Sequence, residues 1–354
     1  MSRKSNNNSN ASGVCLLLRT LKRVLTGDRD YINKVSAYKD DADYLEIKHN
    51  GNVDYGKIVY VIKENCDHDG FCSALRFLMC NLIFAEQHGL ASKIVLSNSF
   101  AYYDAEKSKE ISNPWEYYFI QAEKDIDENN ALNVCYGNYY QMEMIRERYD
   151  INAYKIENYQ NEEIIRICSP IIRKYFVLKP EITSQAIEML NKAREDGRKV
   201  LGVHYRGTDF KSGYNGHPVC IDEEQLIAEM VKAIKDGGFT SVFVATDDLA
   251  ICDKIKTSLK DTEVLMFPDV YRSSGDKSVA FSEDERRFHH YLLGYEIARD
   301  MYTLSLCDGL LAGKSLVSFM SNLFKHSRND KYEYMHIIDN GNYSSDKPFV
   351  ARPE

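Results

Sequence analysis

The stretch KVLGVHYRGTDF, from Lys199 to Phe210, combines an apolar run with three chemically active side chains. Its apolar part is typical of a buried β-strand, and that strand ends in His204, Arg206 and Asp209. Ligands bind at the carboxyl ends of parallel strands in α/β proteins, and an arginine there presents a planar set of donors that matches phosphate oxygens. The stretch therefore predicts a strand that leads into a binding site for an anion.

Strand and helix patterns alternate through the second half of the chain. The segment EITSQAIEMLNKAREDG (residues 181–197) predicts a helix before the Lys199 strand, with Thr183 as a candidate N-cap and Gly197 as a stop. Capped amphipathic segments predict helices over 222–235, 249–259, a segment ending near 305, and 315–326; apolar runs predict strands over 241–248, 263–267, 309–313 and 334–338. This order indicates a parallel sheet with helices on both faces.

The first half shows the same pattern in a shorter form. KIVYVI (57–62) predicts a strand, FCSALRFLMCNLIFAEQHG (71–89) a helix closed by glycine, and KIVLSN (93–98) another strand. Two such sets, joined near 177–180, predict an α/β protein with two facing Rossmann-like domains and a cleft between them. We expect the domains to cover 55–178 and 179–345, preceded by an extension over 1–54.

The predicted extension has an unusual composition. Residues 2–12 are nearly all Asn and Ser, which predicts a disordered tail. VCLLLRTLKRVL (14–25) then combines leucines with three basic residues, and it is far shorter than the roughly 20 apolar residues that span a membrane. Two interpretations stay open: a basic amphipathic helix that contacts a membrane surface or a partner, and a short helix packed on its own domain.

Composition limits the classes of partner. The 354 residues include 53 acidic and 45 basic ones, a net charge of -8, which argues against a general nucleic-acid binder. Nine cysteines occur without any CxxC pair, so neither zinc nor dithiol spacing is present. Reduced thiols, together with the lack of a secretory signal, favour a cytoplasmic protein.

The charged and hydroxyl residues of the second half gather at predicted strand ends. They are His204, Arg206, Asp209, Asp247, Asp248, Lys314 and Ser315. Carboxyl ends of parallel strands meet at one edge of a sheet, and a helix that begins at such an edge binds phosphate through its first N–H groups. An aspartate on a neighbouring strand can hold ribose hydroxyls or the edge of a base. The set predicts a site for a nucleoside diphosphate.

Several segments resemble known enzymes in order and spacing. GVHYRGTDF (202–210), VFVATDD (242–248) and the run from Asp300 through LSLCDGLLAGKS (304–315) resemble three motifs of the α-1,6-fucosyltransferases and of their relatives, the nodulation and protein O-fucosyltransferases. NCDHDGFCSALRFLMCNLIFAEQHG (65–89) and NPWEYYF (113–119) resemble the first domain of the same enzymes. The resemblance extends over about residues 57–340.

The resemblance implies a GT-B fold and the transfer of fucose from GDP-fucose to a glycan, with inversion, without a metal and with no other cofactor. Arg206 matches the arginine that holds the diphosphate, and His204 and Asp300 match positions that contact guanine. The remaining matches are Asp247 and Asp248 with the paired acids of the second motif, and Ser315 with a serine beside the phosphate-binding turn.

The chain departs from the α-1,6 enzymes at three places, one of which is in the first domain, where Asp67 to Gly70 stand in place of their glycine-rich turn. Gly207 stands where they have a second arginine, and the segment KSGYNGHP (211–218) lacks an acidic residue that is their candidate base. Asp209, His217 and Asp69 are alternatives for the general base. The linkage and the acceptor are therefore left open, and so is a non-catalytic binder of nucleotides or glycans.

Other readings use different parts of the chain. A metal-dependent transferase would hold its cation with an acidic DxD, and Asp67-His68-Asp69 is the DxD that follows a predicted strand. A related enzyme with another nucleotide sugar is a further alternative. The aromatic residues between 101 and 178 would serve either as core or as a platform for sugar rings; they include Trp115, Tyr117, Tyr118, Tyr139 and Tyr140.

Overall fold

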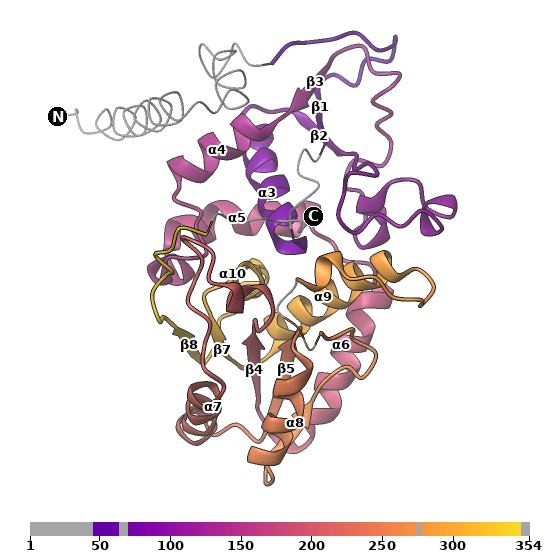
Figure 1. Ribbon diagram of the computed structural model, residues 1–354. Coiled ribbons are helices and arrows are strands. Elements are labelled where there is room, and N and C mark those ends of the chain that lie inside the picture. Colours follow the sequence, from indigo (N-terminus) through magenta and orange to yellow (C-terminus); the bar gives the residue numbers. More distant parts are fainter. Residues whose placement is uncertain (1–44, 64–69, 274, 276–277, 348–354) are drawn as a thin grey trace, which may run out of the picture. The chain divides into compact units, whose positions relative to one another are not determined.

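The computed structural model describes residues 45–63, 70–273, 275 and 278–347. The described chain divides into two compact units (Figure 1). The first consists of residues 45–63, 80–93 and 123–151, and the second of the rest. This grouping differs from the predicted division at 178/179, since 94–122 and 152–178 belong to the second unit. The predicted tail and the basic segment 14–25 lie outside the described residues.

The first sheet has three strands in the order β2-β1-β3. β1 is Val59–Ile62, β2 is Ala91–Ile94 and β3 is Val134–Gly137, and β3 pairs in parallel with β1. All four residues of β1 are fully buried, as expected for a central strand. The neighbouring helices are α3 (Phe71–Gln87) and α4 (Tyr139–Arg148).

The predicted strand over 93–98 starts and ends later than the observed β2. β2 stops at Ile94 because side-chain amides, not a neighbouring strand, bind the backbone beyond it. The carbonyl of Ile94 accepts hydrogen bonds from Asn113 Nδ2 at 2.9 Å and Gln121 Nε2 at 2.8 Å, and the N–H of Leu96 donates to Asn113 Oδ1 at 3.0 Å. The strand β3 was not predicted.

The second sheet is parallel, with five strands in the order β6-β5-β4-β7-β8. Its strands are β4 Val200–Tyr205, β5 Ser241–Thr246, β6 Glu263–Leu265, β7 Gly309–Gly313 and β8 Tyr334–Ile338. β4, the first of these five strands along the chain, lies at the centre of the sheet. The strand order reverses between β4 and β7, as in Rossmann folds. The predicted α/β class with parallel sheets is confirmed.

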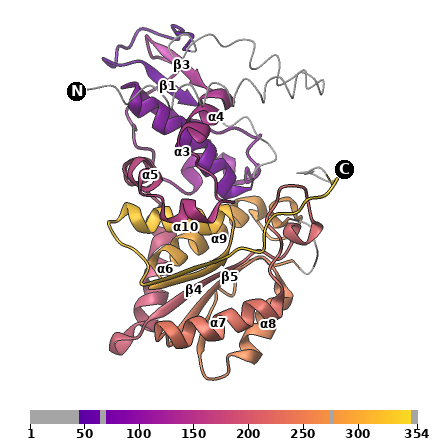
Figure 2. The same cartoon turned by 90° about the vertical axis from the view of Figure 1, so that its left-hand side faces the viewer.

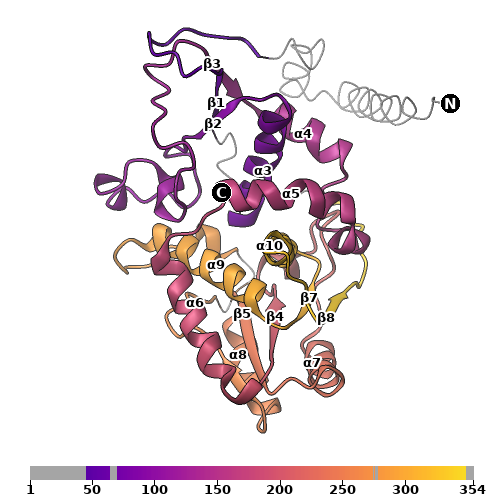
Figure 3. The same cartoon turned by 180° about the vertical axis from the view of Figure 1, so that it is seen from behind.

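Helices cover both faces of this sheet (Figure 2). One face carries α7 (Glu223–Gly237) and α8 (Leu249–Ser258), whose apolar residues share a core with Leu201, Val203 and Tyr205 of β4. The opposite face carries α9 (His289–Leu306) and α10 (Leu316–Ser327). α6 (Pro180–Ala193) packs beside α9, and α5 (Glu162–Tyr175) packs on α10 (Figure 3).

The start of α6 differs from the prediction. Lys179, not Thr183, is the N-cap, and Pro180 occupies the first helical position. Proline suits that position because its fixed φ is helical and no N–H is needed there. The Thr183 hydroxyl instead donates to the carbonyl of Pro180 at 3.3 Å. Asp222 and Ser315, by contrast, cap α7 and α10 as predicted.

The aromatic residues of NPWEYYF form core. Trp115, Tyr117, Tyr118 and Phe119 are each 1% exposed. Trp115 stacks on Phe119 with ring centroids 4.1 Å apart, and both pack edge-on against Phe176. These contacts explain why residues 94–122 group with the second unit, and they exclude these rings as an exposed sugar platform.

Two further expectations concern the cysteines and the lengths of apolar helices. Within the described ranges seven cysteines are free, which agrees with the predicted reduced thiols. No helix in the part of the chain that the structure describes is both long and apolar enough to span a bilayer.

Candidate functional site

The polar groups of KVLGVHYRGTDF face α9. Gly202 and His204 are alternate residues of β4 and therefore lie on one face of the sheet, and Arg206 follows just beyond the strand. A Cβ at Gly202 would lie 3.1 Å from side-chain atoms of Leu304 and Cys307, so this is the face that α9 covers. Glycine at this position lets α9 approach the sheet closely.

Asp300 belongs to the helix that covers the face of β4 on which His204 lies. α9 runs antiparallel to β4, because it is followed by β7, which is parallel to β4. The step from Leu304 to Asp300 is about 6 Å along the helix, and the step from Gly202 to His204 is about 7 Å along the strand in the same direction. Asp300 and His204 therefore both lie beyond the contact between Gly202 and Leu304, one on the helix that covers this face of the sheet and the other on the central strand.

The carboxyl of Asp300 is buried, and its Oδ1 accepts no hydrogen bond from a described residue. The residue is 7% exposed, and Oδ1 has no hydrogen-bond partner among the described residues. Burial raises the pKa of Asp300 to about 7, although Arg299 and Arg272 act in the opposite direction. A buried acceptor that its own protein leaves unpaired is rare, and a perturbed pKa in such a place is typical of functional sites.

His204 lies at the point where the strand order reverses. Its Nδ1 is 3.2 Å from Oγ of Ser315, which follows β7 and caps α10 through the N–H of Ser318 at 3.1 Å. Burial, assisted by the charge of Arg206, lowers the pKa of His204 to about 4, so the imidazole is neutral at physiological pH. Such reversal points are where open α/β sheets bind ligands.

The contacts of Arg206 include Asp247 and Ser278. Its Nη1 forms an ion pair with Asp247 Oδ2 at 2.7 Å, and Nη2 donates to Ser278 Oγ at 3.2 Å. The Arg206 side chain is 23% exposed. The predicted cation at the strand end is in place, and its pairing with Asp247 was not predicted.

Both acids of VFVATDD act on the loop after β4. Asp247 accepts hydrogen bonds from the N–H of Gly207 at 3.0 Å and from the hydroxyl of Thr208 at 2.6 Å. Asp248 caps α8 through the N–H of Ala250 and forms an ion pair with Lys211. The carboxylates thus fix the conformation of the chain that carries Arg206.

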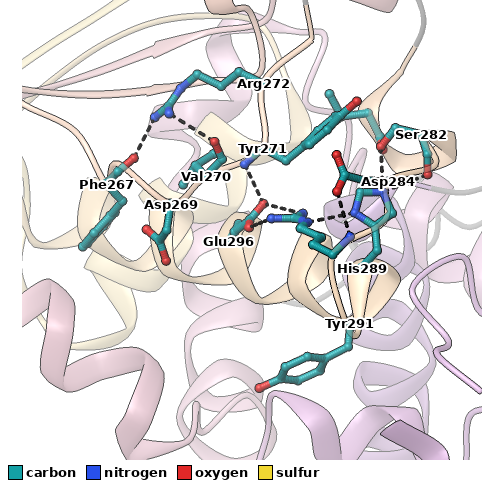
Figure 4. A network of polar contacts seen from close by, with 12 residues as sticks. Phe267, Asp269, Val270, Tyr271, Arg272, Ser282, Asp284, His289, Tyr291 and Glu296 are labelled. Atoms are coloured by element: carbon teal, nitrogen blue, oxygen red, sulfur yellow. Dashed lines mark hydrogen bonds and ion pairs between the residues drawn. The ribbon is translucent and has the colours of Figure 1, made fainter. Parts of the chain in front are cut away.

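A second polar network holds the connection between β6 and α9, which carries Ser278. Arg286 forms an ion pair with the buried Glu296 through both its Nη atoms, and its Nε donates to His289 Nδ1 at 2.8 Å. Glu296 also accepts the N–H of Tyr271 at 3.0 Å (Figure 4). These residues were not predicted from the sequence, because the polar loop before α9 has no recognisable motif.

The remaining predicted residues have varied positions. Lys314 is 4% exposed and is engaged by Asp339 and by Asn342, whose Oδ1 is 2.9 Å from its Nζ. Lys314 is therefore tied to the end of β8 and not presented to a ligand. Asp209 begins a short 3-10 helix, Asp209–Ser212, and its side chain is outside what the structure describes.

The candidate bases and metal ligands lie in different parts of the chain. Asp67-His68-Asp69 lies outside the described residues. The ring of His217 lies 5.8–6.0 Å from the ring centroids of Tyr154, Phe210 and Tyr214. No cluster of three or more His, Cys, Asp or Glu residues suited to a metal ion occurs in the ranges that the structure covers.

Gly207 is required by close packing, which yields a testable expectation. A Cβ at this position would lie 2.5 Å from Asp248 Oδ2 and 2.6 Å from Tyr205 Cε1, both on buried side chains. Gly207→Ala should lower the free energy of unfolding by about 1–3 kcal/mol, measured by urea denaturation. Gly275→Ala is the control, since its Cβ would meet only Ser273 Oγ, at 3.6 Å. Equal stability of the two variants would contradict this packing argument.

Comparisons with known proteins give structural matches alone. No protein-family model matches the sequence, and no curated protein matches it. A NodZ alpha-1,6-fucosyltransferase soaked with GDP-fucose is 17% identical over 76% of this chain and 93% of that chain, with a TM-score of 0.45. NodZ from Bradyrhizobium is 16% identical over 82% of this chain and 100% of that chain, with a TM-score of 0.46. POFUT1 in complex with GDP is 12% identical over 82% and 98%, with a TM-score of 0.44.

Proposed function

We propose that this protein transfers fucose from GDP-fucose to a glycan hydroxyl, as an inverting, metal-independent enzyme of GT-B architecture. The observation that carries the proposal is the buried carboxyl of Asp300, unpartnered among the described residues, on the helix that covers the face of β4 on which the neutral His204 lies. Guanine presents the N1–H and N2–H donors beside the O6 acceptor. A carboxylate and an imidazole N–H on neighbouring elements complement that edge.

Arg206 supplies the electrostatic part of the reaction in this proposal. The acceptor hydroxyl attacks the anomeric carbon and gives its proton to water or to the departing phosphate, the bond from that carbon to the β-phosphate oxygen breaks, and GDP leaves with the electron pair. Negative charge grows on the phosphate, and a cation fixed beside it binds the transition state better than the ground state. Asp247 and Ser278 orient the guanidinium, and the Ser278 hydroxyl is the weaker partner that a phosphate oxygen would replace.

One observation favours a second candidate, a non-catalytic binder of GDP or GDP-sugars. The ion pair with Asp247 reduces the positive charge that Arg206 offers to a leaving group. Release of GDP from GDP-fucose separates the two functions. A binder would be stabilised by GDP and would release none, even at high protein concentration.

Nucleotide selectivity tests the proposal. GDP at about 100 times its Kd should stabilise the fold by about 2.7 kcal/mol, which raises the Tm in a thermal-shift assay. UDP, ADP and CMP at the same concentration should not, because they lack the donor pair that Asp300 accepts. Stabilisation by UDP alone would refute the assignment, and turnover that needs Mn²⁺ after EDTA treatment would refute metal independence.

The location and the acceptor are part of the same proposal. We place the protein in the cytoplasm, with contact to a membrane surface through residues 14–25. An acceptor glycan attached to a lipid or displayed near a membrane would suit such a location. Sedimentation with anionic vesicles, compared between the full chain and a chain without residues 1–25, tests the contact.

A further inference from the structure

A chain of buried hydroxyl groups ends at His204. Tyr159, Ser315 and Ser318 are each no more than 3% exposed, and His204 is 5% exposed. The Tyr159 hydroxyl is 2.9 Å from Ser318 Oγ, Ser318 Oγ is 2.9 Å from Ser315 Oγ, and Ser315 Oγ is 3.2 Å from His204 Nδ1. Tyr159 comes from the segment before α5, far away in the sequence from the other three residues.

The position of Tyr159 is well determined. Asn322 Nδ2 donates to its carbonyl at 2.7 Å, and its ring packs edge-on against Phe319 with centroids 5.3 Å apart. The N–H of Ser315 donates to the Tyr159 hydroxyl at 3.2 Å. The hydroxyl is therefore an acceptor for the backbone at the start of α10 and a donor to its neighbours.

The available partners order the protons along the chain. Ser318 Oγ is 2.9 Å from the carbonyl oxygen of Gly313, which can only accept, so the Ser318 proton goes there. The Tyr159 hydroxyl has two acceptors, Ser318 Oγ at 2.9 Å and the carbonyl oxygen of Ser315 at 3.1 Å, and the shorter contact favours Ser318 Oγ. With Ser318 supplied in this way, the Ser315 proton is left for His204 Nδ1, and the imidazole then carries its proton on Nε2.

We propose that Tyr159, Ser318 and Ser315 form a hydroxyl relay that fixes the Nε2–H tautomer of His204 and so makes this imidazole a donor to the nucleotide. Nε2 has no hydrogen bond to any described residue. An Nε2–H selects a base with an acceptor, such as guanine O6, and a bare Nε2 would repel it. This inference rests on the proposed function, and Tyr159 is a positioning residue in it.

Removal of one hydroxyl should reverse the tautomer. In Tyr159→Phe, Ser318 Oγ loses its donor and takes the Ser315 proton, so His204 Nδ1 becomes the donor to Ser315 Oγ. Nitrogen-15 NMR of the nucleotide-free protein distinguishes the two tautomers of His204. We expect Nε2–H in the wild type and a shift towards Nδ1–H in Tyr159→Phe.

Binding gives a second readout. Tyr159→Phe should weaken GDP binding about tenfold, the effect of one hydrogen bond, and should weaken binding of 6-thioguanosine diphosphate less, because that nucleotide keeps N1–H and N2–H and replaces O6 by sulfur, a weaker acceptor. Tyr332→Phe is the matched control, because its buried hydroxyl donates to a backbone carbonyl, that of Leu304, at 3.1 Å. It should change neither the NMR signal nor the ratio of the two affinities.

The outcomes separate this inference from the proposed function. An Nδ1–H tautomer in the wild type, or the same tautomer in wild type and Tyr159→Phe, overturns the relay whatever the protein binds. Failure of the wild type to bind GDP refutes the nucleotide assignment, while the NMR comparison still decides the relay. If Tyr159→Phe weakens the binding of both nucleotides equally and leaves the tautomer of His204 unchanged, Tyr159 has a purely structural role.

Discussion

Arg206→Ala is expected to lower the transfer rate by about 100- to 1,000-fold, the cost of about 3–4 kcal/mol for losing one preorganised donor at a developing charge. The reason is that Arg206 is the cation at the end of the central strand, held in place by Asp247 and Ser278. Removal also leaves the Asp247 carboxylate, whose side chain is 8% exposed, without its counter-ion. The kcat for GDP release from GDP-fucose measures the effect.

Arg206→Lys should lower the transfer rate nearly as much as Arg206→Ala. An ammonium group cannot contact Asp247 and a phosphate with the planar geometry of a guanidinium. Arg166→Ala is the control, because Arg166 lies on the surface of α5 with a side chain that is 72% exposed. If Arg206→Ala or Arg206→Lys retains activity within about tenfold of the wild type, Arg206 has no role in the reaction.

Asp300→Asn is expected to abolish selective GDP binding. The carboxylate can accept from both N1–H and N2–H of guanine, whereas an amide places its own NH₂ against one of these donors. Two hydrogen bonds to a charged acceptor are worth about 3–4 kcal/mol, so the Kd for GDP should rise about 100- to 1,000-fold. Isothermal titration calorimetry measures this Kd.

The same substitution should stabilise the protein without nucleotide. Folding raises the pKa of Asp300 from its ordinary value of 3.8 to about 7, so the folded state disfavours the ionised form. Stability is therefore unaffected below the ordinary pKa, decreases as the pH rises through this range, and is lowest above about pH 7. An asparagine removes that penalty but leaves an unpaired amide, so we expect a net gain of about 1–3 kcal/mol near pH 8 and little change near pH 4.

The pH dependence of binding should follow from the same group. Because guanine requires the ionised carboxyl, GDP binding to the wild type should weaken as the pH falls below about 7, and binding should release a proton. Asp253→Asn on the exposed side of α8 is the control and should alter neither quantity. An Asp300→Asn variant that binds GDP normally, or that is less stable than the wild type at pH 8, would contradict this account.

Much of the second sheet was predictable from the sequence. β5, β7, β8, α7 and α10 lie where hydrophobic patterns, caps and glycines placed them, because these signals are local. The errors occur where distant side chains decide the backbone. β2 is displaced because Asn113 and Gln121 bind the chain beyond Ile94. β3 lies in a stretch whose pattern is obscured by aromatic residues.

The residues of the candidate site were likewise predictable only in part. The order of strands and the residue types at their ends predict His204, Arg206 and Ser315 at one edge of the sheet, because they follow from positions along the chain. The pairing of Arg206 with Asp247, and the engagement of Lys314 with Asp339, depend on contacts between segments that are far apart in the sequence. A strand-end position does not reveal whether a charged group faces a ligand or another side chain.

The sequence alone determined which residues could do the chemistry, because periodicity and strand ends are properties of neighbouring positions. Only the tertiary structure decided which of them are free to act. Asp300 is left unpaired in the interior, while Asp248 and Lys314 are neutralised by partners. The physical reason is that burial and charge pairing arise from the packing of α9 and the strand-end loops, and no local pattern contains that information.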